Sequence, residues 1–201
     1  MIAIIDYDAG NMMSVVKAFE FLGQEIRVTR KREDLREASK VVLPGVGAFG
    51  DAMARLKRYD LIEPIRETVR EGKPFRGICL GLQLLFERSD EAPGASGLGI
   101  LKGDILRIPE APGLKIPHMG WNDLHMEKDS RIFTGLGEKP YVYFVHSYYL
   151  KASDPSDVAA TTKYGVRIDA AVERDNVFAS QFHPEKSSQT GMKILQNFAA
   201  L

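Results

Sequence analysis

The stretch RGICLGLQLLF, residues 76–86, decides how the rest of the sequence is interpreted, because it contains the only cysteine of the chain, Cys79. Gly77 stands two residues before this cysteine and Gly81 two residues after it. The residues before it (FRGI, 75–78) predict a strand, and LGLQLLFERS (80–89) predicts a helix. This G-x-nucleophile-x-G form is typical of a nucleophile elbow, a strained strand-to-helix turn that lifts a reactive side chain out of a sheet.

Such a corner would suit a reactive thiol. The first amides of the following helix would point at the sulfur and favour the thiolate, which is the nucleophilic form. The Leu80 amide would be one donor of an oxyanion hole. The alternative is that Cys79 is a small buried hydrophobe and that the glycine pair serves close packing.

Outward from this corner, the first half of the chain alternates strands with helices. Strands are expected at 2–5, 26–29, 41–44 and 75–78, and helices at 11–23, 32–38 and 50–70, the last broken near Pro64. This order predicts a parallel sheet with helices on both faces. Residues 89–99 predict a loop, and most later segments predict strands, at 104–108, 121–126, 141–150, 159–164, 167–173 and 177–182, before a last helix at 189–200. We therefore expect one α/β domain, 1–201, with a partly antiparallel second half.

Composition excludes several classes of function. Lys and Arg together number 27, as do Asp and Glu, so no basic field points to nucleic acid or an anionic membrane. No apolar run approaches the roughly 18 residues of a membrane span, and the first residues lack the pattern of a signal peptide. One cysteine forms neither an internal disulfide nor a thiolate zinc site. The sequence predicts a soluble cytoplasmic protein without a metal or other cofactor.

A thiol nucleophile needs a base and a group that orients the base. His183 lies in FASQFHPEKSS at the end of an expected strand, and Glu185 follows two residues later. Side chains at i and i+2 of a strand face the same way, so the carboxylate could hold the imidazole in the tautomer that accepts the thiol proton. The alternative is a solvated loop histidine beside a surface glutamate. We expect His118 and His146 to be core histidines and His125 to lie at the surface.

The segment VVLPGVGAFGDA, residues 41–52, is a glycine-rich turn between a strand and a helix. It lacks the lysine of a phosphate-binding loop and the glycine spacing of a dinucleotide site. We expect it to bring a backbone amide to a substrate as a second oxyanion donor.

Together these elements resemble the class I (triad) glutamine amidotransferases. GICLGLQLLF resembles the nucleophile elbow of this family, and FHPEKS resembles its His-Pro-Glu signature. The resemblance implies a flavodoxin-like fold and a triad of Cys79, His183 and Glu185. It also implies that the thiolate attacks the carboxamide of glutamine, that His183 protonates the leaving ammonia, and that water hydrolyses the thioester.

Further motifs narrow the resemblance. DYDAGNMMSV, LPGVGAFGDAM, FERSDEAPG, PHMGWN and YFVHSYY resemble the glutaminase subunits of imidazole glycerol phosphate synthases, which belong to histidine biosynthesis. By position, the resemblance implies an oxyanion strand from Pro44 to Gly47, with Val46 and Gly47 beside Leu80. It implies that glutamine is bound by Gln83, Glu91 and the backbone of Ser147 and Tyr148, and that a partner faces Asn11, Trp121, Tyr143 and Lys186.

The implied partner is a separate cyclase chain with a (β/α)8 barrel, which would form a heterodimer with this chain and use the ammonia to make imidazole glycerol phosphate and an aminoimidazole carboxamide ribotide. We expect the Val46 amide to point away from the substrate until that partner binds. The alternatives are a glutaminase of the anthranilate or aminodeoxychorismate type, a non-catalytic regulatory subunit, or a cysteine peptidase on a related fold. Two positions depart from the family pattern: Arg76 stands where an apolar strand residue is usual, and Asp8-Ala9 replaces a commoner small or glycine-bearing pair.

Overall fold

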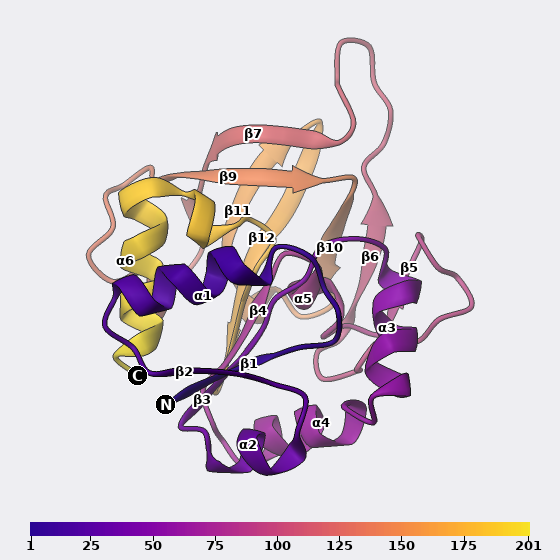
Figure 1. Ribbon diagram of the computed structural model, residues 1–201. Coiled ribbons are helices and arrows are strands. Elements are labelled where there is room, and N and C mark those ends of the chain that lie inside the picture. The colour runs from indigo at the N-terminus through magenta and orange to yellow at the C-terminus, as the bar shows by residue number, and fades with distance from the viewer.

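The computed structural model describes residues 1–201 and is built on a large central sheet flanked by helices (Figure 1). The eight strands of this sheet follow the order β2-β1-β3-β4-β13-β12-β11-β8. The five from β2 to β13 pair in parallel, and the remaining pairs are antiparallel. Their bounds are β1 Ile2–Ile5, β2 Ile26–Thr29, β3 Lys40–Leu43, β4 Phe75–Ile78, β8 His125–Met126, β11 Val158–Tyr164, β12 Val166–Arg174 and β13 Val177–Ser180. The predicted α/β class with a mostly parallel sheet is confirmed.

Helices cover both faces of the sheet, as predicted. They are α1 Met12–Phe21, α2 Arg32–Glu37, α3 Phe49–Arg58, α4 Ile62–Arg70, α5 Leu80–Gln83 and α6 Ser188–Ala199. Successive side chains of a strand point to opposite faces, so Ile2 and Ile4 pack in one buried cluster with α1 and α6. Ala3 and Ile5 pack in the other cluster with α2, α3 and α4. No helix has the length and apolar character needed to span a bilayer.

Two small sheets stand beside the central one. The first contains β10 Tyr148–Ala152, β6 Gly103–Arg107 and β5 Arg88–Ser89, and the second contains β7 His118–Asp123 and β9 Tyr141–His146. The single strand expected at 141–150 is therefore wrong, because the chain leaves β9 after His146 and enters a different sheet at Tyr148. Ser147 forms the corner between them.

The break expected near Pro64 lies elsewhere. The helix α3 ends at Arg58 and α4 begins at Ile62, so the chain turns at residues 59–61. Pro64 is the third residue of α4. A proline is tolerated there because the first N–H groups of a helix have no partner within the helix.

The helix expected over 80–89 is a single turn. The helix α5 ends at Gln83, and the next carbonyls accept bonds from a segment that folds back along the chain. The amide of Leu98 donates to the Leu84 carbonyl at 2.8 Å, and those of Ile100 and Leu101 donate to the Leu85 carbonyl at 2.9 and 3.0 Å. The helix prediction was wrong beyond its first turn because this tertiary pairing replaces the helical hydrogen bonds.

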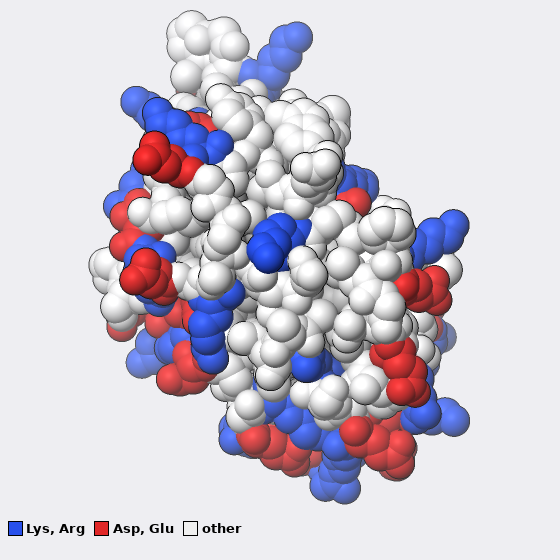
Figure 2. Space-filling model, turned by 90° about the vertical axis from the view of Figure 1, so that its left-hand side faces the viewer, with Lys and Arg blue, Asp and Glu red and all other residues white.

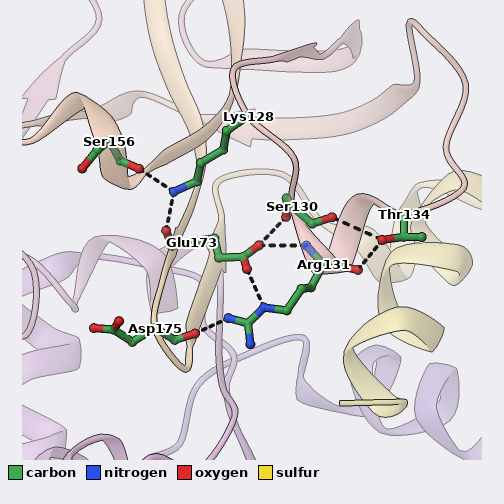
Figure 3. A network of polar contacts seen from close by, with 7 residues as sticks. All are labelled: Lys128, Ser130, Arg131, Thr134, Ser156, Glu173 and Asp175. Atoms are coloured by element: carbon green, nitrogen blue, oxygen red, sulfur yellow. Dashed lines mark hydrogen bonds and ion pairs between the residues drawn. The ribbon is translucent and has the colours of Figure 1, made fainter.

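A polar network fixes segment 128–134 against the turn after β12 (Figure 3). The Glu173 carboxylate accepts hydrogen bonds from Ser130 Oγ at 2.5 Å and from Arg131 at its backbone N (3.1 Å) and Nε (2.7 Å). Lys128 Nζ donates to the Glu173 carbonyl at 2.7 Å. The Arg131 guanidinium also stacks on the Phe178 ring at 4.6 Å. The Glu173 carboxylate, which is largely buried, therefore has its own cation.

Candidate active site

Cys79 occupies a strained corner between β4 and α5. Its backbone has φ 54° and ψ −109°, a conformation that a residue with a side chain adopts only when the surrounding structure enforces it. The flanking glycines serve close packing and do not themselves adopt the strained conformation. A Cβ on Gly77 would lie 2.8 Å from the Gly81 carbonyl oxygen, and one on Gly81 would overlap the Leu43 carbonyl. The strain therefore resides in Cys79, and the two glycines allow the backbone to pack tightly around it.

The structure brings His183 and Glu185 together. His183 Nδ1 lies 2.8 Å from Glu185 Oε1, and their side chains are 1% and 0% exposed. The strand argument was wrong, because β13 ends at Ser180 and Glu185 lies in a 3-10 turn, Pro184–Lys186. This turn brings the carboxylate to the ring, and Ser187 Oγ supports it by donating to the His183 carbonyl at 2.6 Å.

The surroundings of His183 favour its protonated form. Burial alone lowers the pKa of the imidazole, but its interactions with Cys79 and Glu185 outweigh burial and raise the pKa above its ordinary value. Its Nε2 atom is buried and makes no hydrogen bond. Since the thiolate is the reactive form of cysteine, a protonated His183 suits a thiolate–imidazolium pair.

Gln181 is a site residue that sequence reasoning missed. Its side chain is fully buried, and Nε2 lies 3.7 Å from Cys79 Sγ in donor geometry. Its Oε1 accepts from Gln83 Nε2 at 3.0 Å. The available signal was a glutamine two positions before His183, directly after the end of β13 at Ser180.

A cavity of about 340 Å³ opens over Cys79. All the predicted oxyanion and substrate residues line this cavity, namely Val46, Gly47, Leu80, Gln83, Glu91, Ser147 and Tyr148. The other lining residues are Cys79, Pro117, Val145 and His146. Gln83 Nε2 donates to the Tyr148 carbonyl at 3.1 Å, and Glu91 Oε2 accepts from the Phe49 amide at the start of α3 at 2.7 Å. The volume is sufficient for a small molecule.

Two of the three expected oxyanion donors, the amides of Leu80 and Val46, are not oriented together toward a substrate. The Leu80 amide donates to the Gly45 carbonyl at 3.2 Å. The Gly45–Val46 peptide is trans, so its N–H points opposite to that carbonyl and the Val46 amide points away from Leu80. The Tyr7 hydroxyl holds the preceding Pro44 carbonyl at 2.8 Å. Gly47, just beyond, has φ +103°.

The residues expected to face a partner divide into two groups. Trp121 is 52% exposed on β7 and stacks edge-on against Tyr143 of β9 at 6.2 Å, and Lys186 is exposed. Asn11 is half-buried, and its Nδ2 donates to Glu185 Oε1 at 2.8 Å, which links this position to the proposed triad. On the face over α1 and α6, charged side chains gather at the lower edge and flanks, whereas the centre is mostly uncharged apart from isolated basic side chains (Figure 2).

The remaining histidines lie where the sequence predicts. His118 and His146 are buried, with 3.0 Å between His118 Nδ1 and His146 Nε2. His146 Nδ1 lies 2.8 Å from the Tyr148 carbonyl oxygen, and the side chain of His125 is 54% exposed. No group of three or more His, Cys, Asp or Glu side chains is arranged to hold a metal ion.

The chain is similar to known proteins over nearly its whole length. Residues 3–201 match the family model described as glutamine amidotransferase class-I. The chain is 46% identical over 201 residues to the "Imidazole glycerol phosphate synthase subunit HisH" of Caldanaerobacter subterraneus, covering 100% of this chain and 98% of that one. It is 52% identical over 196 residues to the protein of the same name from Aquifex aeolicus, covering 97% and 94%.

Solved structures share the fold. The structure of PurLQS from Thermotoga maritima superposes with a TM-score of 0.77 at 25% identity and covers 99% of this chain and 97% of that one. A crystal structure described as a glutamine amidotransferase superposes with a TM-score of 0.75 at 23% identity and covers 98% of each chain.

Proposed function

The chain belongs to the class I glutamine amidotransferase family and, within it, to the HisH subunits of imidazole glycerol phosphate synthase, and on this premise we propose that it hydrolyses glutamine at Cys79. The observation that carries the proposal is a strained, buried cysteine that opens into a cavity of about 340 Å³ near a hydrogen-bonded His183–Glu185 pair. A purely structural cysteine needs neither the strained backbone nor the cavity.

In the proposed reaction, the Cys79 thiolate attacks the side-chain carbonyl carbon of glutamine and forms a tetrahedral oxyanion. Protonated His183 gives its proton to the departing nitrogen, so ammonia leaves and a glutamyl thioester remains. Neutral His183 then takes a proton from water as the water attacks the thioester, which releases glutamate and restores the thiolate. Glu185 orients the ring through Nδ1. Gln83, Glu91 and the backbone of Ser147 and Tyr148, all lining the cavity, would hold the substrate.

The ammonia would pass to a separate cyclase chain in the cytoplasm. Relatives that this chain matches over 94–98% of their length are named as subunits, which supports a partner subunit. The partner would be a (β/α)8 barrel that docks on the exposed face carrying Trp121 and Tyr143 and forms imidazole glycerol phosphate. These relatives give no support to an anthranilate-type glutaminase or to a non-catalytic subunit.

The blocked oxyanion donors support activation by the partner. Rotation of the Gly45–Val46 peptide would release the Leu80 amide and turn the Val46 amide toward the substrate at the same time. The test is glutamate release from glutamine by the chain alone, with a cyclase chain, and with that chain plus its nucleotide ligand. We expect a low first rate and the highest rate in the third mixture. No glutamate in any mixture would refute the proposed function, and equal rates would refute the activation.

A further inference from the structure

Arg76 is a buried cation in the centre of the sheet. It lies on β4 between Val42 of β3 and Phe178 of β13, and its side chain is 0% exposed. No carboxylate lies within ion-pair distance of it. A buried charge without an ion-pair partner is costly, so the presence of an arginine here calls for a compensating role.

The contacts of Arg76 lead to the catalytic histidine. Its Nη2 donates to Ser180 Oγ at 2.9 Å, and Ser180 Oγ donates to the Phe182 carbonyl at 3.2 Å. Phe182 immediately precedes His183. The remaining nitrogens, Nε and Nη1, are buried without a partner. The guanidinium therefore holds one end of the segment that carries the imidazole.

Glu185 is the buried anion that lacks a full set of partners. Its Oε1 accepts from His183 and Asn11, each at 2.8 Å, whereas its buried Oε2 has no partner. If Cys79 and His183 form a thiolate–imidazolium pair, their charges cancel and Glu185 leaves the buried site with one net negative charge.

The other largely buried carboxylates already have cations. Glu173 is paired with Arg131 at 2.7 Å (Figure 3), and Asp157 has Arg174 at 3.6 Å. Arg76 makes no such pair and remains to balance Glu185. Burial lowers the pKa of Arg76 to about 9, and the charge of Glu185, followed by that of Glu173, opposes this shift. Arg76 is therefore a cation at neutral pH.

We propose that Arg76 is a positioning residue of the glutaminase site, which fixes the 180–182 segment beneath His183 and places a buried positive charge that balances the net negative charge of the triad. The inference rests on the proposed function. The other cations near Glu185 are less suited to this role, since Lys186 is exposed and Lys193 lines the open groove between α1 and α6. From the turn before α1 the neutral amide of Asn11 reaches the carboxylate.

The test compares Arg76→Leu, Arg76→Lys and the parent chain, each with the cyclase chain, across pH 5 to 9. Without the positive charge of Arg76 the net negative charge of the buried triad is unbalanced, so the acid limb of the kcat/KM profile should move to higher pH in Arg76→Leu, by on the order of one unit. Arg76→Lys keeps the charge and should shift less. In a Glu185→Gln background, Arg76→Leu should cause no further shift.

A second readout does not require turnover. Cys79 is the only cysteine, so its alkylation by iodoacetamide reports the thiolate directly. The pH at which the alkylation rate falls on the acid side should move together with the acid limb of the kcat/KM profile. Arg174→Leu is the matched control: it removes a cation from a buried carboxylate away from the triad and should leave both profiles in place.

Stability separates this role from a structural one. Because Arg76→Leu removes two unpaired buried nitrogens, the midpoint of its thermal unfolding should stay the same or rise. Profiles equal to those of the parent would overturn the inference while leaving the proposed function intact. Loss of cooperative unfolding in both Arg76→Leu and Arg76→Met would overturn it too, because Arg76 would then serve the fold.

Discussion

Replacing Gly47 with alanine should raise the glutaminase rate of the free chain and weaken its stimulation by the cyclase. Gly47 has φ +103°, and a Cβ built there meets nothing within 4 Å. The substitution therefore acts through the backbone and not through a clash. A residue with a side chain held at such a φ costs about 1–3 kcal/mol, and this cost falls on the conformation in which Gly45 blocks the Leu80 amide.

The expected magnitude follows from this strain. If rotation of the Gly45–Val46 peptide relieves the positive φ, a penalty of 1–3 kcal/mol raises the open fraction by about 5- to 140-fold, since 1.4 kcal/mol corresponds to a factor of ten. The basal rate should rise by the same factor while the stimulated rate stays nearly constant. There is room for such a rise, because one missing oxyanion donor costs about 10² to 10³ in turnover.

The assay measures initial rates of glutamate release for the free and the fully stimulated chain. Gly72→Ala is the matched control, because Gly72 also has a positive φ, +78°, with nothing within 4 Å of its Cβ, and it follows α4 away from the cavity. It should lower stability without changing the ratio of the two rates. A Gly47→Ala chain that kept the parent's ratio would show that Gly47 does not absorb the rotation.

Three further results are expected. Cys79→Ser should abolish glutamine hydrolysis while ammonium salts still support the cyclase, because a hydroxyl titrates far above a thiol; near-normal hydrolysis would contradict the nucleophile assignment. Loss of the proton acceptor in His183→Ala should cost on the order of 10² to 10⁴ in rate, and Glu185→Ala should cost less, so the reverse order in steady-state kinetics would contradict these roles. Burial lowers the pKa of His118 to about 4 and that of His146 to about 3. Below about pH 6.5 these two imidazoles therefore become protonated in the unfolded chain while they are still neutral in the folded chain. The free energy of unfolding should then fall by up to about 2.7 kcal/mol per pH unit, and denaturant titrations that show equal stability at pH 7 and pH 5 would refute this.

Features that depend on short stretches of sequence could be predicted. The alternation of strands and helices in the first half gave the parallel sheet, because each segment carries its own apolar period. The Cys79 corner and the contact between His183 and Glu185 could likewise be expected from residues within a few positions of each other. Even there the cause was partly misjudged, since a 3-10 turn and not a strand joins the histidine to the carboxylate.

Features set by distant contacts could not be predicted. The helix after Gln83 stops because residues 98–101 take over its carbonyl groups. Asn11 was expected to face a partner, but the turn before α1 directs its amide to Glu185, 174 positions away. Gln181 has no marker of its own apart from its polarity. In each case the contact that determines the structure involves residues distant in the sequence, so the local hydrophobic pattern does not predict it.

The edge-on stack of Trp121 and Tyr143 allows the intrinsic fluorescence of the chain to report on its assembly with another protein. Trp121 is the only tryptophan, and it stands half exposed on the face proposed for docking. The Tyr143 carbonyl in turn accepts the His183 amide at 2.9 Å, so the indole stacks on a residue whose backbone is bonded to that of the proposed base. Intrinsic fluorescence excited at the indole band should therefore change in intensity and wavelength when another protein covers this face, without any label. A titration followed in this way would measure assembly separately from turnover.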